Sequence, residues 1–259
     1  MNEKDERMLN KAYEKINNNK GCMDVMTGLV ELKKEFKRNA DPEQAANLQR
    51  FFKTGKGEYG EGDVFLGLKV PIQRSIAKKY KELTLGEIEK LLESKIHEHR
   101  MIALFILIGK YEKAVEPEKK HIFDFYLRNT RNINNWDLVD LSAPNIVGDY
   151  LVEKDRSILY KLARSRELWE RRIAILATFA LIKRKESKDA LAIAELLLSD
   201  KHDLIHKAVG WMLREVGKRV SQDDEENFLK KHYNTMPRTM LRYAIERFPE
   251  KKRIFYLKK

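Results

Sequence analysis

The chain of 259 residues has little cysteine and no long apolar run, and both absences bear on its location. Its one cysteine, Cys22, cannot form an internal disulfide, which favours a reducing compartment. The sequence has no run of about 18 apolar residues, the length that a membrane-spanning helix needs. Residues 1–10 are charged throughout and lack the apolar stretch of a signal peptide. We therefore expect a cytoplasmic protein.

Glycine and proline are also scarce, with 12 and 6 residues. No long segment alternates apolar and polar residues as a half-buried strand would. Lys, Glu, Leu, Arg, Ile and Ala dominate, and 42% of the residues are hydrophobic, so a sizeable core can form. The composition predicts an all-α protein. The length allows one domain or two, and we expect a single helical domain over residues 1–259.

The chain has fewer acidic than basic residues. Its 40 aspartates and glutamates and 52 lysines and arginines give a formal net charge of +12. Such an excess favours partners with a dense negative field, either nucleic acid or an anionic membrane surface. The basic residues are spread along the chain, so no basic tail accounts for them.

Helix-start signals arrive at short intervals. These N-cap, capping-box and early-proline patterns lie at Asp41-Pro42, Thr84-Leu85-Gly86-Glu87, Glu116-Pro117, Ser187, Ser221-Gln222-Asp223-Asp224 and Met236-Pro237. Comparable helices recur around Arg100, Trp136, Arg171, His206 and Arg242, at steps of 36, 35, 35 and 36 residues by subtraction. A period of this kind indicates stacked helix pairs. The Trp-Leu-Gly-Tyr pattern of tetratricopeptide repeats is absent, so an α-α superhelix of HEAT-like repeats fits better.

Such stacks are curved, with one concave face. Arg100, Trp136, Arg171 or Arg172, Lys207 and Arg242 recur at equivalent places, so we expect them to line that face. The result would be a concave basic groove containing aromatic rings, which suits a nucleic-acid backbone.

One segment, Thr54 to Asp63, interrupts the helical pattern and holds four of the glycines. A phosphate-binding loop would continue with Gly-Lys-Ser/Thr, and this one does not. We interpret the segment as a flexible or tightly turned connector before a helix that begins near Pro71.

Three runs carry unusual chemistry for helix faces: Asn-Trp-Asp-Leu-Val-Asp at 135–140, Trp-Glu-Arg-Arg at 169–172 and Gly-Trp-Met-Leu-Arg-Glu at 210–215. Trp136 and Asp140 are four residues apart, so on a helix an aromatic ring lies beside a carboxylate. That pairing suits a cationic, ring-shaped species. Taken singly, Trp136 and Trp211 would more often be core residues, and Asp140 could be a helix cap.

Together with Phe-Leu-Gly-Leu-Lys-Val-Pro at 65–71, these runs resemble the AlkD family of DNA alkylation repair glycosylases, from about Ala45 to Phe248. The resemblance implies a HEAT-like solenoid that holds duplex DNA in its concave groove and removes N3- or N7-alkylated purines, without drawing the damaged base into a pocket. It also implies that Trp136, Asp140 and Trp211 are the active-site aromatic, carboxylate and second aromatic. Arg172 matches a groove arginine that contacts the DNA backbone.

The stretch matching the family's N-terminal tyrosine holds Phe51 instead, so a hydroxyl is missing there. We expect Phe51 to face the DNA. The candidate contacts to the DNA backbone are Lys69, Arg74, Arg172, Lys207, Arg214, Lys218 and Arg242.

An alkylated purine already carries positive charge, so its glycosidic bond breaks without a metal or a cofactor. Asp140 would stabilise the oxocarbenium-like sugar cation that forms. His202 and His206 could share a helix face around a metal, but no third ligand at usable spacing completes a site. We expect a monomeric glycosylase acting on alkylated double-stranded DNA.

Two rival functions remain open. A non-catalytic protein could bind distorted or branched DNA with the same groove, and the absence of a hydroxyl at Phe51 leaves room for it. A HEAT-type protein scaffold would bind a protein partner without salt-dependent DNA binding, and the charge of +12 argues against it.

Overall fold

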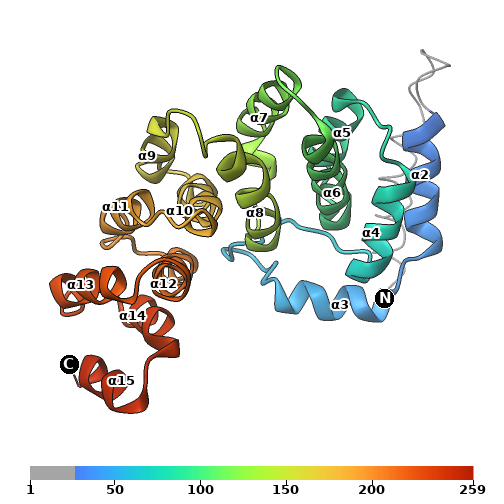
Figure 1. Cartoon of the computed structure of the whole chain (residues 1–259). Helices are drawn as coiled ribbons and strands as arrows, with labels where there is room; N and C mark the ends of the chain where they lie inside the picture. The colour runs from blue at the N-terminus through green and yellow to red at the C-terminus, as the bar shows by residue number, and fades with distance from the viewer. Residues whose placement is uncertain (1–26, 259) are drawn as a thin grey trace. The chain divides into compact units, whose positions relative to one another are not determined.

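The computed structural model describes residues 27–258, and this part of the chain is helical (Figure 1). Its β structure is limited to an isolated bridge between Val64 and Ile96. The all-α prediction is therefore confirmed. No helix in this part combines the length and the apolar character that a membrane span requires. Cys22 lies outside the described residues.

The chain divides into two compact units, and the boundary between Ile106 and Leu107 falls inside helix α6 (His97–Lys113). The first unit also contains α2 (Thr27–Arg38), α3 (Pro42–Phe51), α4 (Val70–Lys79) and α5 (Leu85–Leu92). The α-helices that follow α6 in the second unit are α7 (Glu118–Arg128), α8 (Trp136–Ser142), α9 (Ser157–Ala163), α10 (Leu168–Lys183), α11 (Lys188–Leu196), α12 (Asp203–Arg219), α13 (Gln222–His232), α14 (Arg238–Ala244) and α15 (Glu250–Leu257). Three short elements join them: the 3-10 helices η1 (Thr130–Asn132) and η3 (Ile245–Arg247) and the π-helix η2 (Pro144–Gly148). A single domain over the whole chain stays a prediction.

The predicted helix starts agree with the observed ones, and three of them carry a side-chain cap. The side chain of Asp41 accepts a hydrogen bond from the Gln44 amide, and Thr84 forms a reciprocal capping box with Glu87. Ser221 caps α13, while Pro117 and Pro237 directly precede α7 and α14. Ser187 also precedes a helix, α11, but its hydroxyl donates to Asp224 at 2.6 Å rather than capping its own helix.

Within the second unit, helices stack in pairs. Figure 1 shows α9, α11 and α13 in one row and α10, α12 and α14 in another. Helix α10 packs against α9, α11 and α12, and nearly every residue from Arg172 to Ile182 is buried. A helix buried on all sides loses the polar face that a surface helix keeps. The stacked helix pairs predicted from the 35-residue period are confirmed.

Two glycines allow neighbouring helices to approach closely. A Cβ added to Gly148 would overlap the Ala177 carbonyl oxygen of α10 and lie 2.8 Å from the Ala180 Cβ. A Cβ added to Gly210 would lie 2.5 Å from the Tyr243 Cβ of α14. Gly148 thus sets how closely η2, which directly follows α8, packs against α10.

Three of the five residues that mark the 35-residue period hold helix starts together, whereas Arg242 is exposed. The side chains of Arg100, Arg171 and His206 each donate a hydrogen bond to the carbonyl six residues earlier, at 2.8, 3.1 and 2.5 Å. Arg100 is 3% exposed and also pairs with Asp63 at 2.6 Å. The prediction that Arg100 lines a groove is therefore wrong, because the carboxylate of Asp63, which precedes α4 in the sequence, binds its guanidinium in the interior.

The glycine-rich segment from Thr54 to Asp63 is a tightly turned connector, one of the two forms predicted for it, because the amides of Glu58, Glu61 and Asp63 each donate to the carbonyl three residues earlier at 3.0–3.1 Å. The residues that follow it are held by α6. The Glu98 carboxylate accepts hydrogen bonds from the backbone amides of Leu66, Gly67 and Leu68 at 2.8–3.2 Å. Asp63, at the end of the segment, lies 3.2 Å from the His97 ring. These contacts fasten the connector to the start of α6.

Candidate functional site

The centre of the candidate site is an ion pair between α8 and α10. The Nε and Nη2 atoms of Arg172 donate to the two carboxylate oxygens of Asp140 at 2.8 and 2.7 Å. The Arg172 side chain is 5% exposed and that of Asp140 is 19% exposed. Nη1 of Arg172 donates to the Leu204 carbonyl near the start of α12. One buried guanidinium therefore ties together the starts of α10 and α12 and the Asp140 carboxylate.

Burial raises the pKa of the Asp140 carboxyl, and the Arg172 guanidinium opposes that shift. The nearby Asp137 carboxylate adds a smaller upward push. Both oxygens accept from N–H groups, so the geometry is that of the ionised carboxylate. Arg172 thus favours the charged form of Asp140 in surroundings that disfavour it.

Trp136 is the first residue of α8, and the Asn135 side chain accepts a hydrogen bond from its backbone amide at 2.8 Å. The indole is half-buried and lies one turn before Asp140, on the same helix face. Asp137 accepts a hydrogen bond from the Leu138 amide at 2.9 Å, a local interaction. Trp136 and Asp140 therefore form the aromatic and acidic face that their spacing predicts.

Trp211 belongs to a second aromatic group. Its ring lies 6.1 Å from that of Phe179 on α10, centroid to centroid, and it is half-buried. Lys183 and Arg219 lie 4.8 and 5.2 Å from the centroid of the same Phe179 ring. Seven residues separate Trp211 from Leu204, so it lies about 10 Å further along α12 than the carbonyl that binds Arg172.

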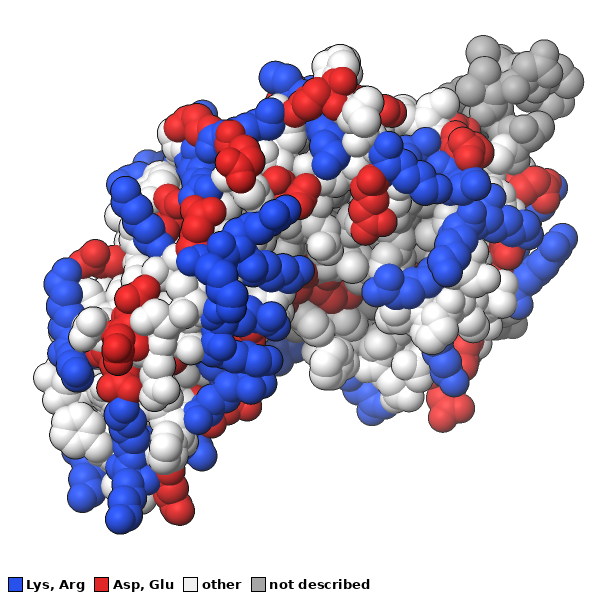
Figure 2. Space-filling view, in the orientation of Figure 1, with Lys and Arg blue, Asp and Glu red and all other residues white. Residues whose placement is uncertain are grey.

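The predicted cationic contacts of the second unit differ in their surroundings. Lys218 and Arg242 are exposed. Lys207 pairs with Asp203 at 2.8 Å, with its side chain 39% exposed. Arg214 pairs with Glu246, and its side chain is 17% exposed. Figure 2 shows lysines and arginines gathered in a band over α10, α12 and α14, so this part of the unit carries a positive surface.

Three predicted DNA contacts belong to the first unit. Lys69 precedes α4 and is exposed. The Arg74 guanidinium lies 4.4 Å above the centre of the Phe105 ring. Phe51 is 64% exposed at the end of α3 and meets the ring of Phe52 edge-on.

The two histidines considered as metal ligands have structural roles. His202 caps α12, where its Nδ1 accepts from the Leu204 amide, and His206 donates to the Asp200 carbonyl. Among residues 27–258, no group of three His, Cys, Asp or Glu side chains is arranged to hold a metal ion.

Two partners in the site escaped the sequence analysis. Phe179 lies seven residues after Arg172, so helical periodicity places it on the same face and offered a signal. The Leu204 carbonyl could not be predicted in this way, because every residue has a backbone carbonyl and the sequence does not distinguish one from another.

Comparisons with known proteins agree with this architecture. The sequence profile of a family described as "DNA alkylation repair enzyme" matches residues 32–248. The chain is similar to a solved structure described as a predicted DNA alkylation repair enzyme from Enterococcus faecalis, with 17% sequence identity and a TM-score of 0.64. That likeness covers 82% of this chain and 98% of the other, and it supports the fold. No curated protein matches the sequence. Because the profile spans most of the chain, the protein belongs to the family of DNA alkylation repair enzymes.

Proposed function

We propose that this protein is a DNA glycosylase that excises positively charged N3- or N7-alkylated purines from duplex DNA. The observation that carries the proposal is the Asp140 carboxylate held by Arg172, partly exposed and one helical turn from the half-buried Trp136. Family membership supports a role in alkylation repair, and the positive band over α10, α12 and α14 supports binding to a DNA backbone.

The proposed reaction needs little catalytic assistance from the protein beyond stabilisation of a positive charge. An N7-alkylated guanine leaves readily because it departs as a neutral base, and the sugar becomes an oxocarbenium-like cation. A carboxylate about 4 Å from that cation interacts by about 4 kcal/mol at an effective dielectric of 20, or about a thousandfold in rate. The Arg172 guanidinium, held at 2.7 and 2.8 Å, offsets part of this field, so the figure is an upper bound.

Trp136 complements the carboxylate. A cation near an indole face gains about 0.5 to 2 kcal/mol, and the ring also excludes water that would screen Asp140. Lys207, Lys218 and Arg242, with the first-unit residues Lys69 and Arg74, are proposed to contact DNA phosphates. We propose that Arg172 positions Asp140. Arg214, whose side chain is partly buried and paired with Glu246, is proposed to contact a DNA phosphate.

The experiment that tests the proposal is single-turnover release of base from a duplex containing N7-methylguanine. Asp140→Asn should slow release by about a hundredfold to a thousandfold, and Trp136→Ala by about tenfold, with DNA binding retained. Asp137→Asn, one residue after Trp136, is the matched control and should change the rate little.

One observation favours a second candidate, the non-catalytic DNA binder. Both oxygens of Asp140 already accept hydrogen bonds from Arg172, as in a purely structural ion pair. This candidate predicts tight, salt-sensitive DNA binding by the wild type without release of base. That result would reject the glycosylase proposal.

A further inference from the structure

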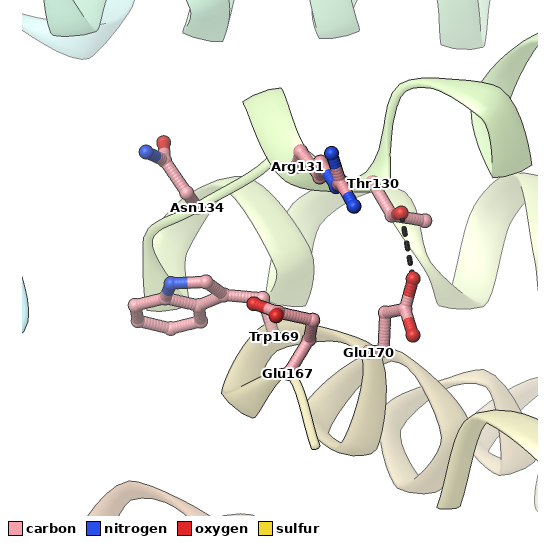
Figure 3. A pocket seen from close by; sticks show the side chains of 6 residues that line it. All are labelled: Thr130, Arg131, Asn134, Glu167, Trp169 and Glu170. Carbon is pink, nitrogen blue, oxygen red and sulfur yellow. Dashed lines mark hydrogen bonds between the residues drawn. The ribbon is translucent and has the colours of Figure 1, made fainter. Parts of the chain in front are cut away.

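A cavity of about 420 Å³ lies between the start of α10 and the segment that precedes α8. Its lining residues are Thr130, Arg131 and Asn134 from that segment, and Glu167, Trp169 and Glu170 from the start of α10 (Figure 3). One hydrogen bond spans the gap, because the Thr130 hydroxyl donates to a carboxylate oxygen of Glu170 at 3.0 Å. A void provides no van der Waals contacts, so the spacing of the two elements here depends on this bond more than on packing.

The same hydrogen bond closes one end of residues 130–140, which we call the entry segment of α8. At one end Thr130 is attached to α10 through Glu170, and at the other end Asp140 is attached through Arg172. The two attachments are ten residues apart in the entry segment, but only two residues apart on α10, which is about 3 Å along the helix axis. Trp136 lies between them in the sequence. Both ends of the segment that carries this indole are therefore fastened near the start of α10.

The Thr130 end of the entry segment is shielded from water. Thr130 is 5% exposed and Glu170 is half-buried, which strengthens the hydrogen bond between them. Asn135 is 0% exposed, and its side chain accepts a hydrogen bond from the Trp136 amide at 2.8 Å. A displacement of Thr130 would reach Trp136 through this short stretch. The buried Ile133 still anchors the stretch, so the displacement is limited.

Glu170 acts on the site through its position and not through its charge. Burial raises the pKa of the Asp140 carboxyl, and the charges that act on it are those of Arg172, which lowers the pKa, and Asp137, which raises it. Glu170 is not among these charges, although it comes two residues before Arg172. A neutral acceptor in the place of Glu170 should therefore serve equally well.

We propose that Thr130 and Glu170 are positioning residues. Their hydrogen bond holds the Trp136 end of the entry segment against α10, and so sets where the indole lies relative to the Asp140 carboxylate. The cavity beside the bond gives the segment room to move when the bond is lost. The role of this bond in base excision rests on the proposed glycosylase function, whereas its role in placing Trp136 does not.

The kinetic test is single-turnover release of base from the N7-methylguanine duplex at saturating protein. Thr130→Val keeps the shape of the side chain without its hydroxyl, and it should slow release about tenfold while DNA affinity changes by less than about twofold. Glu170→Ala should behave in the same way. Thr130→Ser keeps the donor and Glu170→Gln keeps the acceptor, so both should release base at close to the wild-type rate.

Tyr160→Phe is the matched control. It also removes a hydroxyl that joins two elements, since Tyr160 on α9 donates to Asp189 on α11 at 2.6 Å, but it leaves the entry segment untouched. This variant should release base at the wild-type rate. A loss of rate equal to that of Thr130→Val would overturn the proposal, because any lost hydrogen bond would then have the same effect.

The indole N–H signals of the three tryptophans in an NMR spectrum test the placement of Trp136 without base release. Thr130→Val and Glu170→Ala should shift the signals of Trp136 and Trp169 and leave that of Trp211, on α12, unchanged. An unmoved Trp136 signal would overturn the proposal, as would a release rate in Glu170→Gln as low as that in Glu170→Ala. A wild type that releases no base, with a Trp136 signal that moves in Thr130→Val, would reject the glycosylase function and support the positioning role.

Discussion

Arg172 on α10 donates hydrogen bonds to both carboxylate oxygens of Asp140 on α8, at 2.8 and 2.7 Å, across 32 positions of sequence. Asp140 would be harder to ionise without this partner, since burial raises its pKa and Arg172 is the main influence that lowers it. The guanidinium therefore decides both where the carboxylate points and at which pH it is charged.

Replacement of Arg172 should move the acidic limb of the excision rate to higher pH. Arg172→Gln removes the charge that lowers the pKa of Asp140, so the carboxyl stays protonated to a higher pH and the rate falls there. Arg172→Lys keeps the charge but loses the two-pronged contact, so its limb should move less. The measurement is a pH–rate profile under single-turnover conditions. An unmoved limb in Arg172→Gln would show that Asp140 does not control the rate.

A methyl group at Gly148 should destabilise the second unit. Gly148→Ala places a Cβ against the Ala177 carbonyl oxygen and costs about 1 to 3 kcal/mol of unfolding free energy. Thermal or urea unfolding measures the change. The matched control is Gly109→Ala in α6, where an added Cβ meets nothing within 4 Å, and it should be neutral or stabilising by up to about 1 kcal/mol. Equal effects at the two sites would contradict the close packing of η2 on α10.

Three basic residues should account for part of the salt dependence of DNA binding. Lys207→Gln, Lys218→Gln and Arg242→Gln together should reduce the slope of log affinity against log salt by about 3, if each neutralises one phosphate. The matched control replaces Lys188, Lys230 and Lys231 with Gln on α11 and α13, where Lys231 pairs with Glu195 much as Lys207 pairs with Asp203. An equal loss of slope in both triple variants would argue against a contact surface on α12 and α14.

Glu225 should make the protein less stable as the pH rises. Burial raises the pKa of this carboxyl to about 8, with Glu226 adding to the shift and Arg214 and Lys252 opposing it. Between its ordinary value of 4.5 and about 8, the folded chain keeps the proton that the unfolded chain loses. The free energy of unfolding therefore falls as pH rises through that window, by at most about 1.4 kcal/mol per pH unit, and levels off above it.

Glu225→Gln should remove this dependence, so the variant gains stability relative to the wild type across the same window. Urea unfolding at several pH values measures it, and Glu250→Gln on exposed α15 serves as the control. Parallel stability curves for the wild type and Glu225→Gln would show that the carboxyl is not held protonated.

The sequence by itself determined the helices, their caps and their repetition. The capping box at Thr84 and Glu87 and the cap at Ser221 are complete within three or four residues, so no distant contact is needed to form them. The shared face of Trp136 and Asp140 follows in the same way from the helical period. The steps of 35 or 36 residues from Arg100 to Arg242 also predicted the stacked helix pairs correctly.

Only the tertiary structure decided which charged side chains reach the surface. Arg100 and Arg172 look like solvated or DNA-facing arginines in the sequence, yet Asp63 and Asp140 bind them in the interior. The acidic cavity at Trp169 likewise forms only where the segment before α8 meets the start of α10. Exposure of a long side chain depends on which distant carboxylate the packing brings within 3 Å of it, and local periodicity carries no information about that partner.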